Sequence, residues 1–184
     1  MAATESAMLE LGTHAPHFSL KDVVDGKTHT TQSLAGPKGL LVMFICAHCP
    51  FVKHVEQQLA KIGADYKGSG VGIAAISSND VVNYPADSPE NLAKQAKTVG
   101  FTFPYLYDET QAVARAYDAK CTPDFFLFDS AGKLVYRGQL DASRPGNNIP
   151  VSGKDLRAAL DALVAGKPIS GDQWPSIGCN IKWK

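Results

Sequence analysis

An unbroken apolar run that ends in two closely spaced cysteines constrains this chain more than any other feature. The run, residues 40–45, is short and follows a segment with two glycines and a proline, which is typical of a strand buried on both faces. Cys46-Ala47-His48-Cys49 comes next, and apolar residues at helical spacing follow it, with Pro50 suited to a first helical turn. The sequence therefore predicts that both cysteines lie where a buried strand meets the start of a helix.

Sulfur at the start of a helix is chemically activated. The unpaired N–H groups and the positive end of the helix dipole stabilise a thiolate, which is the nucleophile in thiol–disulfide exchange. A second cysteine three residues further on can close a disulfide, and a Cys-x-x-Cys in a βαβ context is typical of a redox site. We therefore predict Cys46, expected to be the more exposed, as the nucleophile and Cys49 as the resolving cysteine. His48 is predicted to favour the thiolate.

The rest of the chain predicts a mixed α/β architecture. Turn residues around Asp25-Gly26 indicate a small hairpin, and helices are expected to open near Ser88, Asp108 and Ser152. Further strands are expected at residues 71–76, 101–107, 125–128 and 134–136. This order predicts an α/β sandwich around a mixed sheet. We expect a single domain over residues 1–184, with a core at about 17–166.

Residues 167–184 are expected to form an irregular tail, anchored by Trp174 and Trp183. Cys179 lies in this tail, and a disulfide between it and Cys121 is one hypothesis. Cys121 itself is read either as a small buried residue or as an accessory thiol near the pair. Lys53 is a second accessory candidate, since it could add positive potential near the cysteines.

Composition excludes several classes of function. The 18 basic and 18 acidic residues give a formal net charge of zero, which provides no electrostatic footprint for nucleic acid or an anionic membrane. The first residues lack the basic start and apolar run of a secretory signal, and no apolar stretch approaches the ~20 residues that span a bilayer. We therefore expect a cytoplasmic location, where structural disulfides are rare.

Several stretches resemble a known family. The residues that carry the resemblance are Cys46-Ala47-His48-Cys49-Pro50-Phe51-Val52-Lys53-His54, Ser78-Asn79-Asp80 with Tyr84-Pro85, and the segments 121–129 and 176–184. The chain resembles the thioredoxin-fold superfamily and, more closely, its peroxiredoxin-like group in the AhpC/TSA class. This resemblance implies a thioredoxin-like three-layer α/β/α sandwich with a mixed central sheet, an N-terminal hairpin, an inserted helix and an irregular C-terminal tail.

The resemblance also implies an activity. Cys46, Cys49 and His48 would be catalytic, and Thr122 with a cis-Pro123 would bind substrate. The expected enzyme is a thiol–disulfide oxidoreductase with antioxidant activity, which needs no cofactor besides its redox-active disulfide. Its expected partners are protein or small-molecule thiols and disulfides, with hydroperoxides as a further class, and no nucleic acid or membrane. Either a monomer or a homodimer is compatible with the sequence.

Two alternatives stay open. The first is a thiol-dependent peroxidase, although Val42 and Cys46 occupy the Pro and Thr positions of the peroxidase motif and Thr122-Pro123 replaces its strand-entry Arg. Arg137 or Arg144 could supply a substitute guanidinium. The second is a redox sensor or metal-binding adaptor without turnover. Cys46, His48 and Cys49 are too few for a structural zinc, so no metal site is predicted.

A loop beyond the second buried strand is a further candidate site. Asn79, Asp80, Tyr84 and Asp87 follow the carboxyl end of that strand, where ligands gather in α/β sheets. They could form a lip that binds the partner. Asn, Asp and Pro also form plain turns, so the alternative is an ordinary loop.

Overall fold

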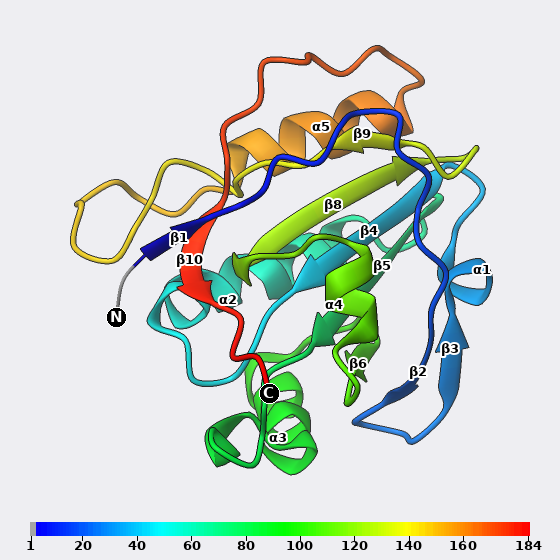
Figure 1. Ribbon diagram of the computed structural model, residues 1–184. Coiled ribbons are helices and arrows are strands. Elements are labelled where there is room, and N and C mark those ends of the chain that lie inside the picture. The colour runs from blue at the N-terminus through cyan, green and yellow to red at the C-terminus, as the bar shows by residue number, and fades with distance from the viewer. Residues whose placement is uncertain (1–2) are drawn as a thin grey trace.

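The computed structural model describes residues 3–184, with helices on both faces of a central sheet (Figure 1). The strands are β1 (Ala3–Glu5), β2 (Ser19–Asp22), β3 (Thr28–Thr30), β4 (Gly39–Phe44), β5 (Val71–Ser77), β6 (Tyr105–Tyr107), β7 (Cys121–Thr122), β8 (Asp124–Asp129), β9 (Leu134–Tyr136) and β10 (Ile177–Asn180). The helices are α1 (Thr31–Leu34), α2 (Pro50–Asp65), the 3-10 turn η1 (Pro85–Asp87), α3 (Pro89–Val99), α4 (Ala112–Ala116) and α5 (Lys154–Val164).

The central sheet is mixed, as predicted. Its seven strands run in the order β3-β2-β6-β5-β4-β8-β9, with β5 parallel to both β4 and β6 and the other pairs antiparallel. All six residues of β4 are buried, which confirms the strand expected from the apolar run. This arrangement is the thioredoxin-like α/β sandwich that the sequence predicted.

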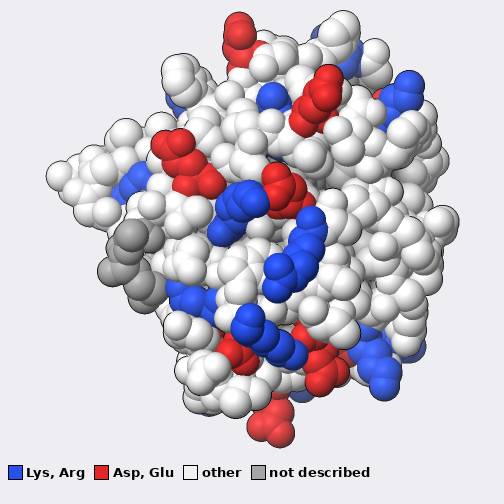
Figure 2. Space-filling model, in the orientation of Figure 1, with Lys and Arg blue, Asp and Glu red and all other residues white. Residues whose placement is uncertain are grey.

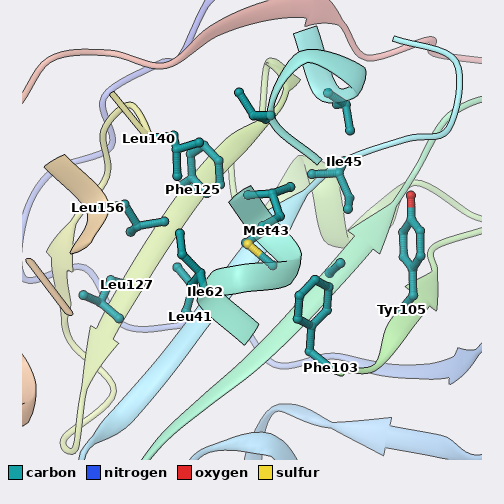
Figure 3. Packing of buried hydrophobic residues seen from close by; sticks show 14 of the residues in the cluster. Leu41, Met43, Ile45, Ile62, Phe103, Tyr105, Phe125, Leu127, Leu140 and Leu156 are labelled. Atoms are coloured by element: carbon teal, nitrogen blue, oxygen red, sulfur yellow. The ribbon is translucent and has the colours of Figure 1, made fainter. Parts of the chain in front are cut away.

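Alternating side chains of β4 and of Ile45, which follows it, build the core on both faces of the sheet. Leu41, Met43 and Ile45 point toward α2 and α5, where they pack with Phe125 and Leu156 (Figure 3). The intervening residues of β4 pack on the opposite face, with residues of α4. The first cluster also contains Cys46 and Cys49, so the cysteine pair is an extension of the core.

Local signals located the starts of α2 and α3 correctly, whereas the cap of α5 is Gly153 and not the expected Ser152. The hairpin of β2 and β3 forms around Gly26, and Ser88 caps α3 by accepting a hydrogen bond from the Asn91 N–H. The helix expected to open at Asp108 begins instead at Ala112. Gln111 adopts a left-handed conformation at its cap, and the Asp108 carboxylate accepts from residues five and six positions on. Asp108 therefore accepts hydrogen bonds from N–H groups in the first turn of α4, but it lies four residues before the helix begins.

The expected irregular tail is found at residues 167–176 and 181–184, but not between them. Residues 177–180 form β10, which pairs antiparallel with β1 on one side and with β7 on the other in a second, three-stranded sheet (Figure 1). The tail is held by buried Cys179 and Ile181, whereas Trp174 is 72% exposed and does not anchor it. Trp183 is 38% exposed and lies under the Arg115 guanidinium. These pairings join distant parts of the chain, so no local pattern announces them.

Close approach of β10 to the Thr122 carbonyl predicts a cost for any side chain at Gly178. A β-carbon added there would overlap that carbonyl oxygen and crowd the Pro123 nitrogen. We expect Gly178→Ala to lower the free energy of unfolding by about 1–3 kcal/mol, measured by chemical denaturation. Gly171→Ala is the matched control, since a β-carbon there meets nothing within 4 Å. Equal denaturation midpoints for the two variants would contradict the packing described.

Candidate functional site

The two cysteines of the motif lie at the start of α2, as predicted. Cys49 is the N-cap residue, Pro50 occupies the first turn, and the Cys49 carbonyl accepts a hydrogen bond from the Lys53 N–H at 2.9 Å. Cys46 lies between the end of β4 and this cap. Both sulfurs therefore belong to the junction where helix N–H groups and the helix dipole favour an anion.

The expected exposure of the first cysteine is not found. Cys46 is 1% exposed and Cys49 is fully buried. The segment of Thr122 covers both sulfurs, while the neighbouring Ala47 and His48 are half-buried. A reacting partner must therefore approach past these two residues to reach Cys46.

Thr122 contacts both cysteines of the motif. Its hydroxyl oxygen lies 3.5 Å from the Cys46 sulfur, and its carbonyl oxygen accepts from the Cys49 thiol at 3.3 Å. The peptide bond between Thr122 and Pro123 is cis. The structure thus brings together the pair and the two residues predicted to bind substrate.

A third thiol, overlooked as a partner of the pair, completes the cluster. The Sγ atom of Cys179, on β10, lies 2.7 Å from the Sγ atom of Cys49. In the register of β10 and β7, Cys179 is opposite Thr122, whereas Cys121 is opposite Asn180. Neighbouring residues of a strand point to opposite faces, so Cys121 and Cys179 face away from one another. The hypothesis of a Cys121–Cys179 disulfide is wrong.

Cys121 and Lys53 lie apart from the sulfur cluster. The thiol of Cys121 is directed to the carbonyl oxygens of Pro123 and Ser176, at 3.6 and 3.9 Å. Burial raises its pKa far above that of an ordinary thiol, which makes it inert. The Lys53 ammonium is half-exposed and pairs with Glu56 at 3.2 Å. These contacts indicate that Cys121 is a small buried residue and that Lys53 belongs to the solvated face of its helix.

Asp87 is the site residue whose role the sequence did not reveal. Its fully buried carboxylate accepts from the N–H groups of Ala47 and His48 at 2.8 and 3.0 Å. The same carboxylate binds the Nδ1 atom of His48 and the Asn79 amide. Asp87 therefore fixes both the backbone of the motif and the imidazole, whose ring also stacks on Tyr84.

The expected partner-binding lip is mostly interior. Asn79 and Asp80 are 3% exposed and hold the C-terminal segment, since the Asn79 side chain accepts from the Lys182 N–H and the Asp80 N–H donates to the Lys182 carbonyl. Tyr84 is 40% exposed beside His48. Of these loop residues, Tyr84 alone has a surface that a partner could contact.

The surroundings of the two thiols favour the first negative charge on Cys49. Hydrogen bonds from Cys46, Cys179 and Thr122 and from the N–H of Val52 outweigh burial and lower the pKa of Cys49 to about 5. Interaction with Cys49, burial and the Asp87 carboxylate raise the pKa of Cys46 well above its usual range. The two thiols thus titrate as a unit, with one proton retained on Cys46.

This distribution of charge predicts a low-pH titration of the reduced protein. We expect the ultraviolet thiolate absorbance to appear around pH 5, and Cys49→Ser to abolish that step while Cys121→Ser retains it. Folding lowers this pKa to about 5, whereas an unfolded thiol titrates at about 8.5. The free energy of unfolding of the reduced protein should therefore rise as the pH rises from about 5 to about 8.5, and this gain should be lost as the pH falls back to about 5. A first thiolate titration near that of a free thiol, about 8.5, would contradict the assignment.

The residues that could support peroxide or metal chemistry are engaged in other contacts. Arg137 donates to Leu9 and Gln173, and Arg144 donates to carbonyl and amide oxygens of residues 139–143, so neither supplies a guanidinium to the cysteines. Ligand atoms of Cys46, His48 and Asp87 lie within 4.8 Å of one another and could hold a metal ion. Asp87 already accepts four hydrogen bonds, however, which leaves it poorly suited as a ligand.

Known proteins with similar sequences and structures identify the class. A thiol–disulfide oxidoreductase ResA from Geobacillus kaustophilus is 30% identical over 131 residues, 71% of this chain and 70% of that protein. An uncharacterized conserved protein from Geobacillus kaustophilus is 56% identical, with a TM-score of 0.98 over 100% of this chain and 97% of its own. A hypothetical protein from Sinorhizobium meliloti is 48% identical, with a TM-score of 0.96 over 98% of both chains.

The fold and these relatives define a thiol–disulfide oxidoreductase of the thioredoxin type. Residues 11–137 match the AhpC/TSA family, and the chain belongs to that family. A thiol:disulfide interchange protein DsbE from Chlorobium tepidum shares the fold at 21% identity, with a TM-score of 0.66 over 85% of this chain and 99% of its own.

The predicted cytoplasmic location is contradicted by the comparison. The ResA relatives and the DsbE-like structures are extracytoplasmic thiol–disulfide oxidoreductases. The prediction rested on the composition of the first residues and on the length of the apolar stretches, and neither feature determines the compartment. Within residues 3–184, no helix is both long and apolar enough to cross a bilayer.

The charged surface shows no large region of one sign on the face that carries β1 and β10. Basic and acidic side chains are interspersed there (Figure 2), in keeping with the formal net charge of zero. This face would therefore exert little long-range attraction on a charged partner.

Proposed function

We propose that the protein exchanges disulfides with partner proteins through Cys46 and Cys49. Cys46 attacks a partner disulfide and forms a mixed disulfide, while the partner's second sulfur leaves as a thiolate. Cys49 then attacks the Cys46 sulfur, which closes the Cys46–Cys49 disulfide and releases the partner as a dithiol. The observation that carries this proposal is the coupled dithiol at the cap of α2, with Thr122 in contact with both sulfurs.

The charge on Cys49 is compatible with attack by Cys46. The two thiols share one dissociable proton, and its transfer from Cys46 to Cys49 moves the thiolate to the sulfur beside the half-buried His48 and Ala47. Cys49 is enclosed by Cys179 and the Thr122 carbonyl, which suits a residue that reacts only within the protein. The sequence-based roles of nucleophile and resolver are therefore retained in the proposal.

His48 acts in this proposal as a positioning residue. Its Nδ1 atom binds Asp87 and lies 4.0 Å from the Cys46 sulfur. The negative Asp87 offsets any positive charge on the imidazole, and it raises the pKa of Cys46. The pair thus limits how strongly the site stabilises a Cys46 thiolate, which favours a less oxidising disulfide than His48 alone would give.

Substrate recognition is proposed to use Thr122 and Pro123. Thr122 contacts both cysteine sulfurs and Pro123 follows it in the chain, so the backbone of a partner that reaches Cys46 is expected to pass against this segment. The chemistry needs no cofactor besides the cysteine pair, and the partners are proteins that carry thiols or disulfides.

An insulin-reduction assay beside a peroxide-consumption assay tests this function. We expect the protein to accelerate reduction of insulin disulfides by a small dithiol, with little consumption of hydrogen peroxide, because the guanidinium groups of Arg137 and Arg144 bind other groups and neither is available at Cys46 and Cys49 to polarise an O–O bond. Cys121→Ser serves as a control with an intact motif. Rapid peroxide turnover without insulin reduction would show that the peroxidase reading is the correct one.

A further inference from the structure

Cys179 differs from an ordinary buried cysteine in what its sulfur contacts. Its Sγ atom lies 2.7 Å from that of Cys49, whereas the equally buried Cys121 is directed to carbonyl oxygens. The two thiols belong to the same small sheet and provide a matched comparison. Only Cys179 is placed to exchange with the sulfur that resolves the proposed reaction.

The position of Cys179 is fixed from both sides. In β10 it is opposite Ala3 of β1 and opposite Thr122 of β7, so it is held on the segment that also covers the motif. Gly178 allows this close approach to Thr122. Figure 1 shows β10 beside the first turn of α2. Two sulfurs held in contact by fixed backbone need little movement to form a bond.

We propose that Cys179 is a third redox-active thiol, which takes the disulfide over from Cys46 by forming a Cys49–Cys179 bond. This inference rests on the proposed exchange at Cys46 and Cys49. After the Cys46–Cys49 disulfide forms, the Cys179 sulfur loses its proton and attacks the Cys49 sulfur. The Cys49–Cys179 bond forms, the Cys46–Cys49 bond breaks, and Cys46 leaves with the electron pair and takes up the proton. No external oxidant or reductant is needed, because the number of disulfides is unchanged.

The environment of Cys179 suits a thiol that acts after Cys46. Burial and the negative Cys49 raise the pKa of Cys179 to about 12, so it stays protonated in the reduced protein and does not compete for partners. Once Cys49 is oxidised, its negative charge is gone and that part of the increase is removed. The transferred disulfide then joins Cys49, which is fully buried, to Cys179, which is 2% exposed. Cys46 is again a free thiol.

The test uses Cys46→Ser, in which the usual disulfide cannot form. On treatment with diamide, a small thiol oxidant, the variant should form one intramolecular bond between Cys49 and Cys179, with the loss of two free thiols per molecule. Peptide mapping under non-reducing conditions should locate this bond, and Cys46→Ser/Cys121→Ser should retain it. Loss of the bond in Cys46→Ser/Cys179→Ser is the matched negative result.

Formation of no internal bond, or of one that involves Cys121, would overturn the inference. A second measurement covers any misfolding of the variants: the wild-type protein carrying one disulfide should react with an alkylating reagent at Cys46. Wild type that leaves Cys179 free to alkylation and Cys46 blocked would also overturn it. Insulin reduction by wild type is scored separately, so failure of the proposed function and failure of this inference are distinguished.

Discussion

Cys46→Ser is expected to bring insulin reduction down to the rate of the added dithiol alone. The serine hydroxyl can neither form a mixed disulfide nor close the bond to Cys49, so both steps of the proposed exchange are lost. Cys49→Ser should instead accumulate a mixed disulfide between Cys46 and its partner, because the second step is missing. The adduct can be detected as a mass increase that disappears on reduction.

Cys121→Ser is the control for both variants, since its thiol is directed to the carbonyl oxygens of Pro123 and Ser176 and away from the motif. It should retain the wild-type rate. Full turnover by Cys46→Ser would reverse the assigned roles, and a stable adduct on Cys49 in that variant would identify Cys49 as the attacking residue.

Asp87→Asn is expected to cause the second large effect, on both stability and reactivity. Its carboxylate accepts four hydrogen bonds, two from the backbone N–H groups of Ala47 and His48 and two from the side chains of His48 and Asn79. The oxygen of an asparagine amide can still accept from the two backbone N–H groups. Its NH2 group would then face the side-chain donors of His48 and Asn79 and could not accept from them. One or two buried donors then lose their acceptor, at about 1–3 kcal/mol each. The free energy of unfolding should fall accordingly in chemical denaturation.

The same substitution should lower the pKa of Cys46, because the negative charge of Asp87 is one of the causes that raise it. Alkylation of Cys46 should therefore become faster at neutral pH, which a purely structural role would not produce. Asp118→Asn provides a matched control, since Asp118 forms an ion pair with Lys120 at the surface. If Asp87→Asn changes neither the pH profile of Cys46 alkylation nor the free energy of unfolding, the role given to Asp87 is wrong.

Features encoded locally were predictable from the sequence. The apolar run that became β4, the proline in the first turn of α2 and the cap at Ser88 each depend on residues close in the chain. The placement of Cys46 and Cys49 at a helix start followed from the same signals. Thr122 and Pro123 came from the family resemblance, since no local rule brings residue 122 to residue 46.

Features that depend on distant contacts were missed. β10 has four residues and pairs with β1 and β7, both far away in the sequence, so its pattern is indistinguishable from that of a loop. Asp87 is separated from His48 by α2, β5 and the loop that follows, and its short 3-10 turn resembles any other turn that contains proline. The proximity of Cys179 to Cys49 depends entirely on β10.

The most direct measurement of the central claim is site-resolved alkylation of the fully reduced protein over a range of pH, with each cysteine followed by mass spectrometry. The account predicts that Cys46 is modified first, at a rate that rises as the dithiol loses the first of its two protons near pH 5, while Cys121 stays unmodified in the folded protein. Modification of Cys46 no faster than that of Cys121 at neutral pH would contradict it.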